Sequence, residues 1–149
     1  MVADAEILLF GPEKHAEGPG VVARLARLAV VGECAELGGT VMLRVSWPRP
    51  SVGSLGDGTE DSLSRVRFPS GLHLDAEFEL CTPDATLYAD RAVHLTGKLS
   101  DLSGQGSELH SEGPGAALAD RKGEAQARLT GVQLTLRETH IDETAPVNR

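Results

Sequence analysis

Hydrophobic and polar residues alternate along much of the chain, and this period of two is typical of β-strands. The most regular run covers residues 72–81. Its apolar positions are Leu72, Leu74, Ala76, Phe78 and Leu80. Because successive side chains of a strand point to opposite faces, one face of this run lies against a core and the other lies in water. The pattern predicts a strand over residues 72–81.

A second alternating run covers residues 41–47 and stops at Pro48, which has no N–H to donate to a neighbouring strand. Residues 28–36 precede this run and can run antiparallel to it. Between them, Gly38 and Gly39 supply the positive φ that a tight turn requires. We therefore predict a β-hairpin here.

Further strands are predicted on both sides of these two runs. Residues 85–99 predict one long strand or two short ones, and residues 6–10 predict another. Near the C-terminus an apolar row shifts by one position across Gly131, as a β-bulge would shift it. This row is formed by Ala125, Ala127, Leu129, Val132, Leu134 and Leu136.

Three kinds of segment interrupt the strand pattern. Val22, Leu25 and Leu28 have helical spacing with two arginines on the opposite side, which allows one short helix over residues 21–29. Gly- and Pro-containing residues 48–62 and 103–115 are predicted to be loops, and the first of them is a candidate lid. The tail, residues 142–149, is expected to fray.

Many short strands at close spacing predict an all-β protein, either a sandwich or a barrel. Two features favour the barrel: small residues alternate with large ones on the inner faces, and the expected bulge at Gly131 would curve a sheet. We therefore predict one antiparallel β-barrel of about eight strands, with room for one short helix. A length of 149 residues suits a single domain, residues 1–149.

Charge and composition exclude several classes of partner. The chain has 14 Lys and Arg against 22 Asp and Glu, for a net charge of −8. This charge disfavours a phosphate backbone as ligand, so no nucleic-acid partner is expected. No apolar run reaches the ~20 residues that span a bilayer, so no membrane segment is expected. Asp4 and Glu6 stand where a signal peptide would be basic, which indicates a cytoplasmic protein.

The reactive residues form no recognisable catalytic or metal motif. The five histidines lack the H-x-H, H-x-x-x-H and H-E-x-x-H spacings, and there is no C-x-x-C or G-x-S-x-G. Cys34 and Cys81 are expected to be free thiols in a reducing compartment. We expect no metal and no cofactor. The excess of Arg over Lys, 11 to 3, is typical of a GC-rich bacterial genome.

Two segments carry a resemblance to a known group of proteins. Residues 72–80 (LHLDAEFEL) and 88–97 (YADRAVHLTG), together with the chain length and the strand-rich plan, resemble the small β-barrel cyclases of bacterial polyketide pathways, which include Diels-Alderase-like enzymes of antibiotic biosynthesis. The resemblance implies a cofactor-free cyclase or isomerase that closes a ring, by [4+2] cycloaddition or a related step, on a hydrophobic polyketide-like precursor held in the barrel. Such enzymes work mainly by folding the substrate, so no catalytic residue can be named.

Five residues are candidates for the ligand-binding site: Trp47, Phe78, Tyr88, Arg91 and Leu95. Arg91 points into the barrel if residues 85–99 keep one register, and otherwise forms a solvated bend with Asp90. Trp47 either lines a cavity mouth or fills the core. The expected partner is a hydrophobic small molecule. The sequence allows a homodimer and does not determine the oligomeric state.

Two other functions fit the same pattern. The first is a non-catalytic carrier or sensor that binds a hydrophobic small molecule in the same pocket. The second is a structural or interaction module with a filled core, whose edge strands pair with another chain.

Overall fold

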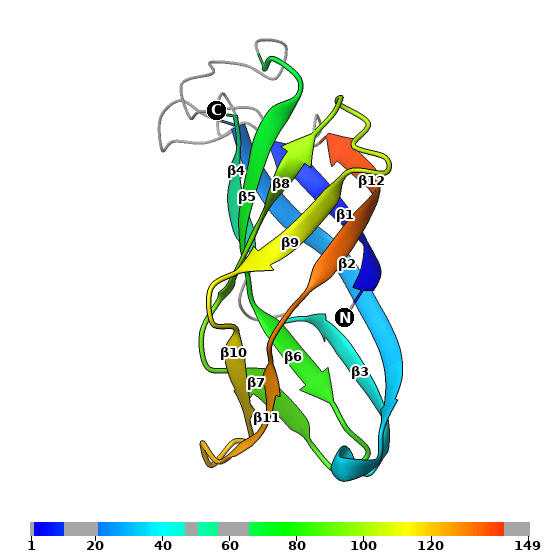
Figure 1. Ribbon diagram of the computed structural model, residues 1–149, viewed down its shortest axis with the longest axis vertical. Coiled ribbons are helices and arrows are strands. Elements are labelled where there is room, and N and C mark those ends of the chain that lie inside the picture. The colour runs from blue at the N-terminus through cyan, green and yellow to red at the C-terminus, as the bar shows by residue number, and fades with distance from the viewer. Residues whose placement is uncertain (1, 11–20, 47–50, 57–65, 142–149) are drawn as a thin grey trace, which may run out of the picture.

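A computed structural model describes residues 2–10, 21–46, 51–56 and 66–141, and this part of the chain is all β (Figure 1). One short 3₁₀ turn, η2 (Ala35–Leu37), accompanies the strands. The strands are β1 (Val2–Phe10), β2 (Val21–Cys34), β3 (Gly39–Val45), β4 (Val52–Leu55), β5 (Ser70–Ala76), β6 (Phe78–Cys81), β7 (Thr86–Ala89), β8 (Val93–Leu99), β9 (Glu108–Glu112), β10 (Ala116–Ala119), β11 (Ala125–Leu129) and β12 (Gln133–Ile141).

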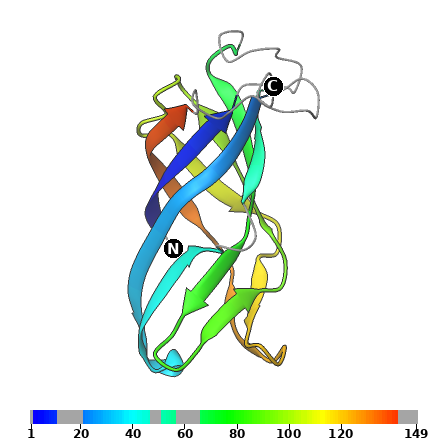
Figure 2. The ribbon, with the colours of Figure 1, turned by 180° about the vertical axis from the view of Figure 1, so that it is seen from behind.

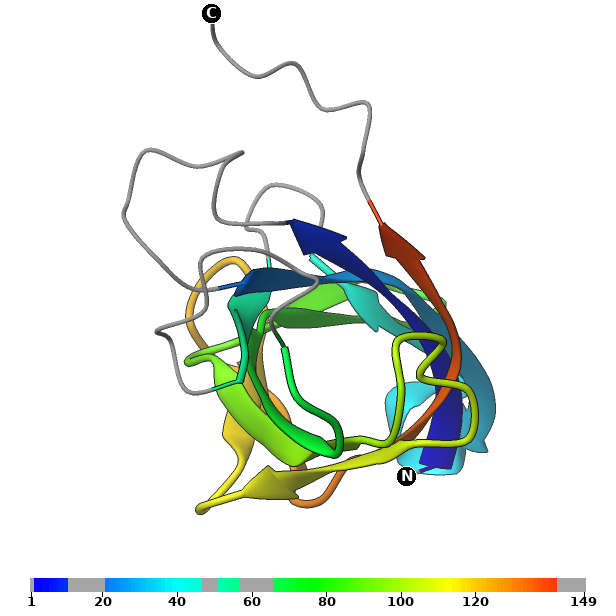
Figure 3. The same ribbon diagram turned by 90° about the horizontal axis from the view of Figure 1, so that it is seen from above.

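Seven of these strands form a closed barrel. Their order is β1-β12-β9-β8-β5-β4-β2, and pairing of β1 with β2 closes the ring. Figure 3 shows the strands surrounding one interior. All pairs in the ring are antiparallel except β1–β12, which is parallel. The predicted antiparallel β-barrel is confirmed, with seven strands in the closed part.

The remaining strands extend the sheet into a half-barrel below the closed barrel (Figures 1 and 2). Strand β2 belongs to both parts, because residues 22–28 pair with β1 and residues 29–34 pair with β3. From β3 the half-barrel continues through β6, β7 and β10 to β11, which ends the sheet. The half-barrel therefore has an open side, whereas the barrel has none.

The segment expected to allow a helix is instead the first part of β2. Val21, Ala23 and Leu25 are buried with more exposed residues between them, which is strand alternation. The pairing of β2 with β1 then shifts, because Leu25 opposes Ile7 while Arg27 opposes Glu6. Residue 26 is thus an extra, bulged residue. The bulge buries Leu25 and Leu28 at a separation of three, which imitates helical spacing.

Two predicted strands are each divided where the chain crosses between barrel and half-barrel. Residues 72–81 belong to β5 and β6, which Glu77 separates, although their apolar residues do face one interior as expected. The expected bulge at Gly131 is instead a passage from β11 to β12. At both crossings, the same face of the chain stays directed toward the core. The apolar pattern therefore continues across each crossing, which is why it predicted a single strand where the structure has two.

Other expectations are met in part. The hairpin is confirmed as β2 and β3, with Gly38 and Gly39 at φ 99° and 128°. Residues 85–99 form two strands rather than one. The predicted loops over residues 48–62 and 103–115 contain β4 and β9. Residues 142–149 lie outside the described residues.

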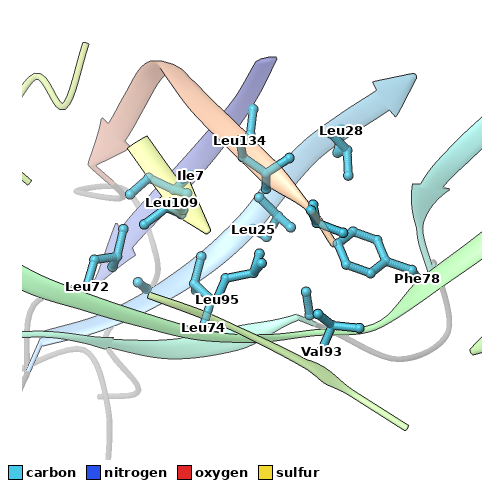
Figure 4. Close-up of a cluster of buried hydrophobic side chains, with 14 of the residues drawn as sticks. Ile7, Leu25, Leu28, Leu72, Leu74, Phe78, Val93, Leu95, Leu109 and Leu134 are labelled. Carbon is cyan, nitrogen blue, oxygen red and sulfur yellow. The ribbon is translucent and has the colours of Figure 1, made fainter. Parts of the chain in front are cut away.

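Aliphatic side chains fill the barrel interior (Figure 4). Leu74, Leu95 and Leu134 come from three different strands, and none of them has any exposed area. The side chains in this core with the least exposure and the largest volume are Phe78, Ile7, Leu9, Leu43, Leu55, Leu72, Leu74, Leu95, Leu99, Leu109, Leu134 and Leu136. The interior of the described barrel is therefore a packed core.

Candidate functional site

Three chain turns lie at the end of the half-barrel, at the lower end of Figure 1, and residues of these turns line a pocket. These turns are η2, the β6–β7 turn and the β10–β11 turn. The pocket has a volume of about 460 Å³ and opens to solvent. Its lining is Ala35, Glu36, Leu37, Gly38, Thr82, Asp84, Ala85, Leu87, Asp120 and Gln126.

The first wall of the pocket is η2 and the glycine that ends it. Gly38 has φ 99°, a left-handed conformation that costs glycine little, and its N–H donates to the carbonyl of Ala35 at 3.1 Å. A Cβ added at Gly38 would lie 3.6 Å from Oδ2 of Asp84. The η2 turn and the β6–β7 turn therefore lie side by side.

Hydrogen bonds within the β6–β7 turn hold the second wall in shape. The N–H and the hydroxyl of Thr82 both donate to the carbonyl of Ala85, at 2.7 and 2.9 Å. The N–H of Ala85 donates back to the Thr82 hydroxyl at 3.0 Å. This closed set of bonds places the exposed Asp84 and Ala85 at the pocket.

Asp120 organises the third wall, the β10–β11 turn. Its Oδ1 accepts hydrogen bonds from the N–H groups of Lys122 and Glu124, at 2.9 and 3.0 Å. Its Oδ2 accepts one from the Gln126 side chain at 3.5 Å. Asp120 thus shapes the turn and also contributes a carboxylate to the pocket.

The lining combines an apolar part with polar groups. Leu37 is half-buried and Ala35 and Ala85 are exposed, so these three residues present apolar surface. Leu87 belongs to the core and is 2% exposed. Glu36, Asp84 and Asp120 supply carboxylates, and Gln126 supplies an amide. Small-molecule sites combine apolar surface for the body of a ligand with polar groups that orient it, and polar groups have the larger share in this lining.

A second open pocket of about 440 Å³ adjoins the first and shares Asp84, Ala85 and Asp120 with it. Its lining adds Thr86, Arg121, Lys122 and Glu124. The two pockets therefore meet at the β6–β7 and β10–β11 turns, and they differ in that only the second contains basic side chains.

The candidate ligand-binding residues from the sequence do not gather at this pocket. Phe78 and Leu95 have no exposed area and belong to the core in Figure 4. Arg91 is exposed in a bend beside Asp90, with its Nε 3.6 Å from Oδ1 of Asp90, so the solvated bend is confirmed and the inward orientation is wrong. The physical reason is that β7 ends at Ala89. Trp47 lies outside the described residues.

Tyr88 lies half-buried on the outer face of the half-barrel, where it is paired in register with Glu79. Glu79 is 5% exposed in its side chain and accepts a hydrogen bond from Nε of Arg44 at 2.5 Å. The hydrogen bond to Glu79, and after it the negative charge of Glu79, raises the pKa of Arg44 above its ordinary value. This buried carboxylate is thus held by one cation.

Replacing Arg44 with methionine is expected to destabilise the protein by about 1–3 kcal/mol, because the Glu79 carboxylate would stay buried without its partner. Urea denaturation followed by circular dichroism measures the loss. The double variant R44M/E79L removes both charges and is expected to recover most of that stability. A double variant less stable than R44M would show that the pair is not the cause.

The pocket residues carry no motif that the sequence reveals. The turns come from positions 35–38, 82–85 and 120–126, and only the fold brings them together. One signal was present: an acidic residue stands in each of these turns, as Glu36, Asp84 and Asp120. Acidic residues are so common in turns that this signal could not have identified a pocket.

Three further observations concern the described residues. These residues contain no group of three or more His, Cys, Asp or Glu side chains with a geometry suited to a metal ion. Among the same residues, no helix has the length and apolar character needed to cross a membrane. Cys34 and Cys81 are both free thiols.

Comparison with known protein families gives a match over the chain. The model of a family described as "Family of unknown function (DUF6004)" matches residues 1–149. No curated protein and no solved structure matches the chain.

Proposed function

This chain belongs to DUF6004, a family of unknown function, and we propose that it binds a small organic molecule in the half-barrel pocket. The observation that carries the proposal is the pocket itself, whose volume of about 460 Å³ combines apolar surface with several polar groups. Pockets that bind small molecules commonly measure about 300–1,000 Å³. The proposal corresponds to the carrier or sensor function.

The half-barrel pocket is a better place for a ligand than the barrel interior. Core side chains such as Leu74 and Leu134 have no exposed area, so a ligand inside the described barrel would have to displace packed side chains. Opening such a core costs several kcal/mol. The half-barrel pocket already exists and requires no such opening.

Ring closure on a hydrophobic polyketide-like precursor is a second candidate for this same pocket. It is supported by the sequence resemblance and by the apolar surface of Leu37, Ala35 and Ala85, against which a linear chain can fold. Folding a substrate into a reactive conformation needs no nucleophile or cofactor. Because the pocket is open to solvent, it suits binding better than a reaction that depends on excluding water.

A pocket-filling variant tests the binding proposal. Thermal shifts are measured on the purified protein with fractionated organic extracts of its native host. A ligand present at about 100 times its Kd is expected to add about 2.7 kcal/mol of stability. The Ala85→Trp variant should lose this response, because the indole would occupy the pocket. Its unliganded stability should change by less than about 0.5 kcal/mol, since Ala85 is exposed.

The control places the same large side chain outside the pocket. Ala117 is half-buried on β10, between the inward-facing Ala116 and Leu118. The Ala117→Trp variant should therefore keep the ligand response. Mass spectrometry of a stabilising fraction then separates the two candidates, since a carrier returns its ligand unchanged and a cyclase returns an isomer. A response that A85W retains in full would contradict binding in this pocket.

A further inference from the structure

The half-barrel pocket is negatively charged on its lining. Glu36, Asp84 and Asp120 contribute a carboxylate each from three separate turns, and the lining contains no Lys, Arg or His. The adjoining pocket differs, because Arg121 and Lys122 stand among its acidic residues. Among the described residues that line the first pocket, the negative charge therefore has no cationic counterpart.

These carboxylates also lack protein partners that would neutralise them. Within the described part of the chain, the carboxylates of Glu36 and Asp84 have neither an ion pair nor a hydrogen bond. Asp120 accepts its short hydrogen bonds from backbone N–H groups, which carry no net charge. Two of the three carboxylates are thus available to a ligand, and the third adds to the local negative potential.

The apolar surface lies next to this charge. Leu37 is in the same turn as Glu36, and the exposed Ala85 directly follows Asp84. A ligand that uses both parts of the lining needs an apolar body and a positively charged group a few atoms apart. An anionic ligand would be repelled, and a purely apolar one would gain no attraction from the exposed, hydrated carboxylates.

We infer that the ligand of this pocket is an organic cation, with an ammonium group beside the carboxylates and a short aliphatic body on Leu37 and Ala85. This inference rests on the proposed function, since it names the class of molecule that the same pocket takes. Solvent-exposed ion pairs are individually weak, so selectivity for the cation arises from several carboxylates acting together. The selectivity is expected to decrease with added salt.

Three probes of matched size test the charge: hexylammonium, 1-hexanol and hexanoate. Each is titrated into ¹⁵N-labelled protein, and Kd is obtained from the amide shifts of residues 35–38, 84–87 and 126. At low salt, hexylammonium is expected to bind about tenfold more tightly than 1-hexanol, the result of two or three weak ion pairs. Hexanoate is expected to bind most weakly.

A double variant with a matched control identifies the carboxylates. E36Q/D84N keeps the size of both side chains and should remove most of the tenfold preference for hexylammonium over 1-hexanol, with Asp120 still present in the lining. Glu108→Gln removes one exposed carboxylate from β9, in the closed barrel, and should leave the tenfold preference unchanged. Both positions of the double variant are exposed, so the fold should be retained.

The outcomes separate this inference from the proposed function. If 1-hexanol binds in the pocket as tightly as hexylammonium, the pocket binds ligands and the cation inference is wrong. If the tenfold preference for hexylammonium survives in E36Q/D84N, the inference is also wrong. If no probe and no extract fraction shifts the pocket amides, the proposed function fails, and the inference fails with it.

Discussion

Replacing Gly53 with alanine is expected to destabilise the protein by about 3 kcal/mol or more, one of the two largest effects expected of a single substitution. Gly53 lies in β4 and pairs with Leu74 of β5 and Ala23 of β2. A Cβ at this position would lie 1.7 Å from the backbone oxygen of His73. Because the clash is with backbone, no change of rotamer relieves it, and the two strands must separate.

A matched pair of controls shows whether the close contact is the cause. Gly32 lies in β2, and a Cβ there would meet nothing within 4 Å, so Gly32→Ala is expected to be neutral or slightly stabilising. Gly97 in β8 would place a Cβ 2.1 Å from the Glu108 oxygen, so Gly97→Ala should resemble Gly53→Ala. Urea denaturation measures all three. A Gly53→Ala variant as stable as Gly32→Ala would refute the described contact between β4 and β5.

Gly53 also shows why part of the barrel was invisible in the sequence. Residues 48–62 contain Pro50 and several glycines, so the segment was predicted to be a loop, yet Val52–Leu55 forms β4. In a strand, glycine ordinarily signals flexibility, whereas here it permits close approach of a neighbouring backbone. A contact between residues 53 and 73 is a property of the fold, and no local pattern could have indicated it.

The alternation of apolar and polar residues predicted best which side chains face the core. Leu72, Leu74 and Phe78 are buried as expected, although the chain passes from barrel to half-barrel at Glu77. Alternation depends only on which face meets the core, and that face is continuous across the crossing. The identity of the neighbouring strands depends on distant parts of the chain, so the division into barrel and half-barrel could not be predicted.

The short helix that the sequence allowed over residues 21–29 illustrates the opposite limit. Leu25 and Leu28 are both buried, and their spacing of three indicated a helix. A bulge in β2 gives the same spacing, because one extra residue reverses the alternation. Over so short a segment, a helix and a bulged strand have the same pattern of apolar residues. Pairing with β1 determines which of the two forms.

The candidate site could be predicted least. Sequence alternation assigned Phe78 and Leu95 to a ligand because apolar residues on an inner face can line a cavity or fill a core. The structure shows that they pack in the core. The half-barrel pocket is built instead from turn residues such as Leu37 and Asp84, whose only shared property is their position at one end of the fold.

Substitution of Phe78 with alanine is expected to cost about 3–5 kcal/mol, and Leu95→Ala about 2–5 kcal/mol. Both side chains have no exposed area, and Phe78 is the largest of the fully buried side chains. Each truncation leaves a cavity whose walls lose their van der Waals contacts. Chemical denaturation gives the two free energies of unfolding, and Val31→Ala, at a side chain 66% exposed, is the control with an expected change below about 0.5 kcal/mol.

The same two variants decide where a ligand binds. If the barrel interior is a packed core, F78A and L95A lower stability but leave binding in the half-barrel pocket unchanged, because neither residue belongs to the pocket lining. If a ligand instead occupied the barrel, its site would include these side chains, and truncating them would alter its affinity at a small cost in stability. Measured together, stability and binding therefore distinguish a barrel that encloses its ligand from one that supports a binding site at the end of its half-barrel.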